Sequence, residues 1–204
     1  AFANVDAFPI CLDTQDPDEI VETVKRIAPV FGGINLEDIS APRCFEIEAR
    51  LKKELKIPVL HDDQHGTATV VLAALINALK VRGLTKEKAK LVLNGAGAAG
   101  NAIAQLLLKV GFKNIVLVDS KGTIYEGRPG LDKNKKKLAK LTNKKKSKGG
   151  LEESLKGADI FVGVSKAGLL TSAMIKEMNP KPVIFAMANP VPEIPYEEAI
   201  EARP

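Results

Sequence analysis

The chain has 204 residues, a hydrophobic content of 45% and a formal net charge of +5 at pH 7. This length suits one large α/β domain or two small ones. No apolar run approaches the roughly 18 residues that a membrane helix needs, and the first residues, AFANVDAFPI, lack the pattern of a signal peptide. The two cysteines, Cys11 and Cys44, favour a reducing compartment. We therefore expect a cytoplasmic protein that does not contact the membrane.

The positive charge is concentrated in residues 131–150, LDKNKKKLAKLTNKKKSKGG, which contain nine lysines and one aspartate. The remainder of the chain is slightly acidic. The segment has no arginine and no aromatic residue that could stack on bases. We therefore expect a solvated helix and loop, and no nucleic-acid partner.

Short apolar runs alternate with segments of helical period along the chain. Strands are predicted at residues 7–12, 31–37, 57–61, 90–95, 114–120, 159–165 and 182–190. Helices are predicted at residues 16–26, 40–55, 64–81, 99–110, 151–158 and 171–178, and within the lysine-rich segment. This alternation, with continuously apolar strands, predicts a parallel sheet that helices cover on both faces. In such sheets, ligands bind beyond the carboxyl ends of the strands.

A glycine-rich turn follows the apolar run KLVLNG. The sequence GAGAAG at residues 95–100 matches G-x-G-x-x-G directly after a predicted strand and at the start of a predicted helix. In that context the pattern indicates dinucleotide binding. Gly95 permits the tight turn, Gly97 lets the backbone approach a pyrophosphate, and Gly100 lets helix and strand pack closely. The alternative is a glycine turn in a flavodoxin-like sheet that binds no nucleotide.

An acid lies where the same pattern requires one. Asp119 stands 19 residues beyond Gly100, at the end of the next predicted strand. Its carboxylate can accept a hydrogen bond from a ribose hydroxyl and would repel a 2′-phosphate, which favours NAD over NADP. Lys121 would weaken that repulsion, so NADP stays open.

Two acidic pairs, Glu37-Asp38 and Asp62-Asp63, each follow a predicted strand. Several carboxylates at one edge of a sheet would repel one another unless a cation lay among them. Ligands that are all oxygen atoms select hard ions such as Mg²⁺ or Mn²⁺. Helix capping explains one acid at each place and is the alternative interpretation.

Residues 61–65, HDDQH, imitate the zinc-protease pattern H-E-x-x-H. That pattern binds zinc because both histidines lie on one face of a continuous helix. Pro58 and its β-branched neighbours predict instead that His61 ends a strand. We therefore expect neither His61 nor His65 to bind metal.

Several segments resemble one known family. GGINLEDISAPRCFEIE and IPVLHDDQHGTATVVLAALINAL resemble the metal region of malic enzymes of the bacterial type. LVLNGAGAAGNAIAQLLL, IVLVDSKGTIYEGR and FAMANPVPEI resemble the cofactor domain of the same family. The resemblance is nearly continuous along the chain. It implies oxidative decarboxylation of malate to pyruvate and CO₂ with NAD(P)⁺ and Mg²⁺ or Mn²⁺.

The resemblance assigns roles to individual residues. The implied metal ligands are Glu37, Asp38 and Asp63, and Asp62 is the implied acid that orients a catalytic lysine. The residues implied to line the pyrophosphate are Ala96, Gly97, Ala98 and Ala99. Asn189 is implied to contact the nicotinamide and the substrate. Glu126 stands where NADP-using relatives often carry a lysine, and with Asp119 it favours NAD.

The resemblance also implies how the chain is organised. Residues 1–64 correspond to the last part of an N-terminal malic domain with the metal-ligand strands. Residues 65–204 correspond to a Rossmann-like NAD-binding domain, truncated at its C-terminus. The family's catalytic tyrosine and lysine would lie upstream of residue 1, and a second substrate-binding asparagine beyond Pro204. We therefore expect the central part of a longer enzyme, inactive when isolated.

Two other functions stay open from the sequence. One is a non-catalytic nucleotide-binding module, and the other is a metal-independent amino- or hydroxy-acid dehydrogenase. Members of the family are commonly dimers or larger, so the resemblance also implies a homo-oligomer for the full-length enzyme.

Overall fold

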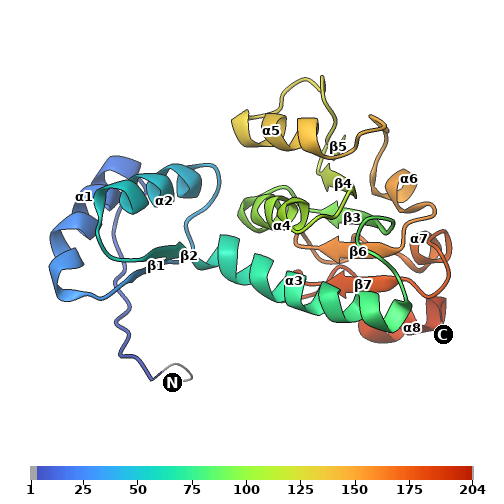
Figure 1. Ribbon diagram of the computed structural model, residues 1–204, viewed down its shortest axis with the longest axis horizontal. Coiled ribbons are helices and arrows are strands. Elements are labelled where there is room, and N and C mark those ends of the chain that lie inside the picture. The colour runs from blue at the N-terminus through green and yellow to red at the C-terminus, as the bar shows by residue number, and fades with distance from the viewer. Residues whose placement is uncertain (1–3, 204) are drawn as a thin grey trace. The chain divides into compact units, whose positions relative to one another are not determined.

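The computed structural model describes residues 4–203, which divide into two compact units, one ending at His61 and the other starting at Asp62 (Figure 1). Within the described residues, no helix is both long and apolar enough to cross a membrane.

The first unit is a small α/β layer. Its elements are α1 (Pro17–Ile27), the 3₁₀ turn η1 (Ala28–Val30), β1 (Ile34–Leu36), α2 (Arg43–Glu54) and β2 (Val59–His61). The two strands are parallel, and Leu36 pairs with His61 at the end of the ladder. A small apolar core joins the helices to the strands; it contains Ile20, Val21, Val24, Leu36, Ile47, Leu51 and Val59.

The sequence explains where α1 begins, but one prediction in this unit is wrong. The Asp16 carboxylate accepts from the N–H groups of Asp18 and Glu19, and Pro17 occupies the first turn, as the sequence predicts. Residues 7–12 form no strand. Pro9 lacks an N–H group, and Phe8 and Ile10 are exposed instead of packing in a core.

The second unit is a helix-covered sheet. Its helices are α3 (Asp62–Arg82), α4 (Ala98–Lys109), α5 (Lys133–Leu141), α6 (Leu151–Leu155), α7 (Ser172–Lys176) and α8 (Tyr196–Ala202). Its strands are β3 (Lys90–Asn94), β4 (Asn114–Asp119), β5 (Gly122–Thr123), β6 (Ile160–Gly163) and β7 (Val183–Ala186). The strand order is β5-β4-β3-β6-β7, and every neighbouring pair is parallel except β4–β5. The short antiparallel strand β5 was not predicted.

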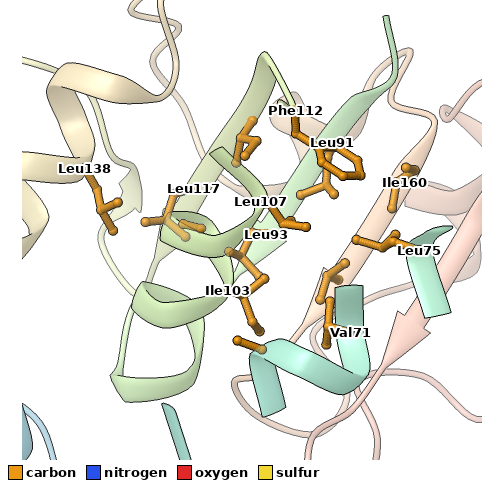
Figure 2. Packing of buried hydrophobic residues seen from close by; sticks show 14 of the residues in the cluster. Val71, Leu75, Leu91, Leu93, Ile103, Leu107, Phe112, Leu117, Leu138 and Ile160 are labelled. Atoms are coloured by element: carbon orange, nitrogen blue, oxygen red, sulfur yellow. The ribbon is translucent and has the colours of Figure 1, made fainter. Parts of the chain in front are cut away.

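Both faces of this sheet are apolar, which confirms the predicted parallel sheet with helices on both sides. Along β3, Leu91 and Leu93 belong to one buried cluster, and Val92 between them belongs to the other. This alternation follows from the two-residue period of a strand. Figure 2 shows the first cluster, in which side chains of α3 and α4 meet those of the strands. The second cluster contains Leu155 of α6 and Ile175 of α7.

The chain order creates a switch point in the sheet. From β3 the chain runs to β4 on one side, and it later returns to β6 on the other side of β3. Loops at the carboxyl ends of β3 and β6 therefore diverge, which opens the position where such sheets bind their ligands.

Candidate functional site

The glycine turn lies at the carboxyl end of β3, beside this switch point. Gly95 has φ +116°, a left-handed conformation that favours glycine. A Cβ atom on Gly95 would lie 2.6 Å from the carbonyl oxygen of Val164, the residue that follows β6. A Cβ atom on Gly100 would overlap the carbonyl oxygen of Gly95. Backbone cannot yield as a flexible side chain can, so the turn requires glycine at both positions.

The start of α4 is arranged to receive an anion. Gly97 is the N-cap residue; it is exposed, and a Cβ atom there would meet nothing within 4 Å. In the described chain no side chain caps α4, whereas Asp16 caps α1 and Asp132 caps α5. The N–H groups of the first turn of α4 are thus available, and the helix dipole favours negative charge at that end. Ala98 and Ala99 begin this turn, and Ala96 precedes Gly97.

Asp119, the last residue of β4, is held by groups of the chain itself. Nη2 of Arg128 donates to Oδ1 at 2.7 Å and to Oδ2 at 2.9 Å. Nζ of Lys135 donates to Oδ2 at 2.9 Å, and the N–H of Lys121 donates to Oδ1 at 2.9 Å. A carboxylate has about four lone-pair positions, so these four hydrogen bonds fill them. A ribose hydroxyl would have to displace or share one of these donors.

These contacts change the electrostatics around Asp119. Burial raises the pKa of Asp119, but hydrogen bonds from Lys135, the Lys121 N–H and Arg128 outweigh burial, so the pKa lies below its ordinary value. The carboxylate is therefore ionised at neutral pH, and two paired cations leave its surroundings net positive. Asp119 alone would repel a 2′-phosphate, but the group of three side chains does not carry negative charge.

Arg128 is itself fixed in place. Its Nη1 donates to the carbonyl oxygens of Gly122 and Thr123, both at 2.9 Å. These carbonyls belong to β5, so the short β4–β5 hairpin positions the guanidinium against the end of β4. The side chains of Arg128 and Asp119 are each 9% exposed, so solvent screens this ion pair weakly.

Asn189 lies beyond the carboxyl end of β7. Asn189 is exposed. Two residues before it, the N–H of Met187 donates to the carbonyl of Gly163, which extends the hydrogen bonding between β7 and β6. The sheet order places β7 on the opposite side of β3 from Asp119. The two predicted cofactor contacts therefore flank the glycine turn, as a dinucleotide extended across the switch point requires.

The first acidic pair directly follows β1, in the first unit. Glu37 and Asp38 are both exposed, and Asp38 has φ +56°. Nδ2 of Asn35 donates to Oε2 of Glu37 at 2.8 Å. A side chain therefore already orients one of the predicted metal ligands.

The second acidic pair opens α3, in the second unit. The helix begins at Asp62, two residues earlier than predicted, so Asp62 and Asp63 both lie in its first turn and are half-buried. The Asp62 carboxylate packs over Gly66, one turn further along α3, in the space that a Cβ atom on Gly66 would need.

The two histidines do not share a helix. His61 is the buried last residue of β2, whereas His65 lies in α3. The predicted strand position of His61 is confirmed, and the zinc-protease arrangement is excluded because it requires both histidines on one helix face.

The predicted metal ligands suit a hard cation in their chemistry. All three are carboxylates, which Mg²⁺ and Mn²⁺ prefer. Glu37 and Asp38 belong to the first unit and Asp63 to the second. Among residues 4–203 no group of three or more His, Cys, Asp or Glu side chains forms a metal-binding arrangement. The shared site therefore stays a prediction.

Sequence reasoning missed several residues that shape these places. Arg128 stands in the segment IYEGR, and Lys135 stands in the lysine-rich segment that was expected to be only solvated. No pattern links either residue to Asp119. Gly66 carried a usable signal, because a glycine near the start of a long helix is costly and needs a reason.

Two family descriptions match the chain. Residues 64–201 match the family described as malic enzyme, NAD-binding domain, and residues 1–52 match the one described as malic enzyme, N-terminal domain. The bifunctional malic/malolactic enzyme of Bacillus subtilis is 58% identical over 203 residues, which are 99% of this chain and 50% of that protein. The NADP-dependent malic enzyme of Rhizobium meliloti is 50% identical over 200 residues, 97% of this chain and 26% of that protein.

A solved structure agrees with these matches. The crystal structure of the NAD-dependent malic enzyme of Thermotoga maritima matches with a TM-score of 0.96 and 52% identity, covering 99% of this chain and 54% of that chain. The chain thus spans about half the length of the Thermotoga enzyme and of the Bacillus enzyme. Both the first and the second unit fall within the matched regions, so the chain belongs to the malic enzyme family.

Proposed function

We propose that this chain carries the dinucleotide-binding and metal-binding parts of an enzyme that converts malate to pyruvate and CO₂ with NAD⁺. The observation that carries this proposal is the glycine turn. It combines two positions that exclude any side chain, an uncapped helix start and a place beside the switch point of a parallel sheet. The family supplies the reaction, because its members are named for malate chemistry.

Each part of the site has a task in this reaction. Bound NAD⁺ would supply the hydride acceptor for C2 of malate, and a bound divalent cation would supply the charge that polarises the 2-oxo group during loss of CO₂. The residues proposed to hold the cation are Glu37, Asp38 and Asp63. The N–H groups of the first turn of α4 receive the pyrophosphate, and Asn189 orients the nicotinamide and substrate.

Asp62 is proposed to position a catalytic lysine that the family carries outside this chain. Its carboxylate is aligned by the first turn of α3, because Gly66 leaves room for it there. The side chain thus has a defined place without being a metal ligand itself. The proton transfers would need groups beyond these 204 residues, so we propose that the isolated chain does not turn over malate.

Titration of the folded chain with NADH and, separately, with NADPH tests the cofactor part. Saturable binding of either nucleotide supports the dinucleotide site, and tighter binding of NADH supports NAD⁺ as the cofactor, with circular dichroism verifying the fold. Failure of a folded chain to bind either nucleotide contradicts the dinucleotide site. We do not propose that the lysine-rich segment binds nucleic acid. DNA binding that is independent of sequence and weakened by salt would contradict this.

The full-length protein tests the metal part. Chelation should abolish malate-dependent NADH formation, and added Mg²⁺ or Mn²⁺ should restore it. Asp63→Asn should raise the metal concentration needed for half-maximal activity. Glu54→Gln is the matched control. Glu54 is the last residue of α2, and it pairs with Lys25 of α1 and not with the proposed metal. Activity that resists chelation would indicate a metal-independent dehydrogenase.

The cellular setting is also a proposal. We propose a cytoplasmic homo-oligomer, a dimer or larger, that binds neither membrane nor nucleic acid. Sedimentation of the full-length protein measures the assembly, and a monomer at working concentration contradicts it.

A further inference from the structure

Glu193 carries a carboxylate that is buried in the second unit. It is 0% exposed, and both of its carboxylate oxygens accept from backbone N–H groups. Its Oε1 accepts from the N–H of Ser165 at 3.0 Å, and its Oε2 accepts from the N–H of Ala188 at 3.0 Å. A buried carboxylate is costly unless its hydrogen bonds are made, so this arrangement needs a reason.

The surrounding chain makes room for this carboxylate. Gly163 is the last residue of β6, and a Cβ atom there would overlap the carboxyl group of Glu193. The backbone carbonyl of Glu193 also accepts from the N–H of Leu170 at 3.1 Å. The segment that carries Glu193 is therefore fastened to the loop after β6 by both its backbone and its side chain.

The two N–H groups that donate to Glu193 come from the loops that follow β6 and β7. Ser165 follows Val164, whose carbonyl oxygen packs against Gly95 of the glycine turn. Ala188 directly precedes Asn189. One carboxylate therefore connects the carboxyl ends of β6 and β7, with the glycine turn at one side and Asn189 at the other.

Only a carboxylate satisfies both loops. Two N–H donors converge on it from different loops, and each needs an acceptor oxygen. Glutamine has the same shape but one oxygen, so its amide nitrogen would face one of the two donors. In a buried place such a mismatch costs more than the loss of an exposed hydrogen bond.

We infer that Glu193 is a positioning residue for the nicotinamide half of the cofactor. It sets the distance between the loop after β6 and the loop that carries Asn189. The proposal places the adenosine half on the other side of β3, where Asp119 is held by Arg128 and Lys135 and not by Glu193. The inference rests on the proposed function, since it assumes that a dinucleotide binds across the switch point.

Calorimetric titration of the chain with NADH and with ADP-ribose separates the two halves. ADP-ribose retains the adenosine and pyrophosphate but lacks the nicotinamide. We expect Glu193→Gln to weaken NADH binding about tenfold, as one mismatched buried hydrogen bond implies, with ADP-ribose affinity unchanged within about twofold. Loss of stability alone would weaken both ligands together.

Glu153→Gln is the matched control. The Glu153 carboxylate accepts from the N–H of Gly150 at 2.7 Å before α6, so the change is chemically the same at a place outside the proposed site. It should leave both affinities unchanged. If Glu193→Gln does not fold, Glu193→Asp keeps both acceptor oxygens on a shorter side chain and should show a smaller loss that is again confined to NADH.

Each other outcome overturns the inference. Unchanged NADH affinity in folded Glu193→Gln, or an equal loss for both ligands in either variant, shows that Glu193 does not position the nicotinamide half. A wild-type chain that binds ADP-ribose as tightly as NADH leaves no nicotinamide contact to position. A folded wild-type chain that binds neither ligand contradicts the proposed function as well.

Discussion

The glycine turn after β3 and the acidic end of β4 are neighbouring parts of one proposed cofactor site, but they are built differently. At the turn, backbone atoms decide the residue type: Gly95 and Gly100 meet carbonyl oxygens that cannot move aside. At the end of β4, side chains decide the properties of Asp119, because Arg128 and Lys135 donate three of the four hydrogen bonds to its carboxylate.

This difference affects how far each place defines a ligand. A backbone site recognises the pyrophosphate, which all dinucleotide cofactors share. The choice between a ribose hydroxyl and a 2′-phosphate depends on local charge, and local charge depends on partners that lie 9 and 16 positions further along the chain. The presence of an acid after the second strand is therefore a weaker guide to specificity than its surroundings.

The largest effect should follow from a side chain at Gly100. Gly100→Ala would place a Cβ atom against the carbonyl of Gly95, so the turn must distort. We expect a loss of about 1–3 kcal/mol in the free energy of unfolding, as for an overpacked core, and NADH binding weakened at least about tenfold. Urea denaturation and NADH titration measure the two quantities.

Gly97→Ala separates recognition from folding at the same turn. An added Cβ atom meets nothing in the chain, so stability should change by less than about 0.5 kcal/mol. NADH affinity should still fall, because the methyl group occupies the approach to the pyrophosphate. Gly32→Ala, also in open space but in the first unit, should change neither. If Gly97→Ala bound NADH as tightly as the wild type, the phosphates would not bind at this turn.

The next effect concerns cofactor choice. Asp119→Asn removes the negative charge and leaves Arg128 and Lys135 unneutralised. The ratio of NADPH to NADH affinity should rise at least about tenfold, because two charges about 4 Å apart near a protein surface interact by roughly 4 kcal/mol. Parallel titrations with the two nucleotides give the ratio. An unchanged ratio would mean that the 2′-position does not approach Asp119.

The same carboxylate should contribute to the pH dependence of stability. Its pKa in the folded chain lies below the ordinary value of 3.8, so its contribution is complete above that pH and is lost as the pH falls through the folded pKa. The stability difference between wild type and Asp119→Asn should be constant from pH 7 to about 5 and shrink below about pH 4. Urea denaturation across this range measures it. A difference that grows toward acid would contradict the lowered pKa.

Features that are visible in a short stretch of sequence could be predicted, whereas contacts between residues distant in the chain could not. Continuous apolar strands such as Leu91–Leu93 and the position of the glycine turn between a strand and a helix are visible in short stretches of sequence, and both were predicted correctly. The contact of Gly95 with the distant Val164 was not predicted. The strand at residues 7–12 was not formed, because a strand needs a partner that local composition does not supply. Lys135 was expected to be solvated, since its contact with Asp119 exists only after α5 packs beside β4.

The smallest effect should come from Glu126, which with Asp119 favoured NAD from the sequence. Its carboxylate forms an ion pair with Nζ of Lys146 at 3.1 Å, and both side chains are at least half exposed. Glu126→Gln should therefore change the NADPH-to-NADH affinity ratio less than about fivefold, because exposed ion pairs contribute at most about 1 kcal/mol and salt screens them. Titration at low and high salt measures this ratio beside that of Asp119→Asn. A larger change than at Asp119 would move the site of cofactor choice from the buried cluster to the exposed loop, because charge density at the 2′-position would then be set by Glu126 and Lys146.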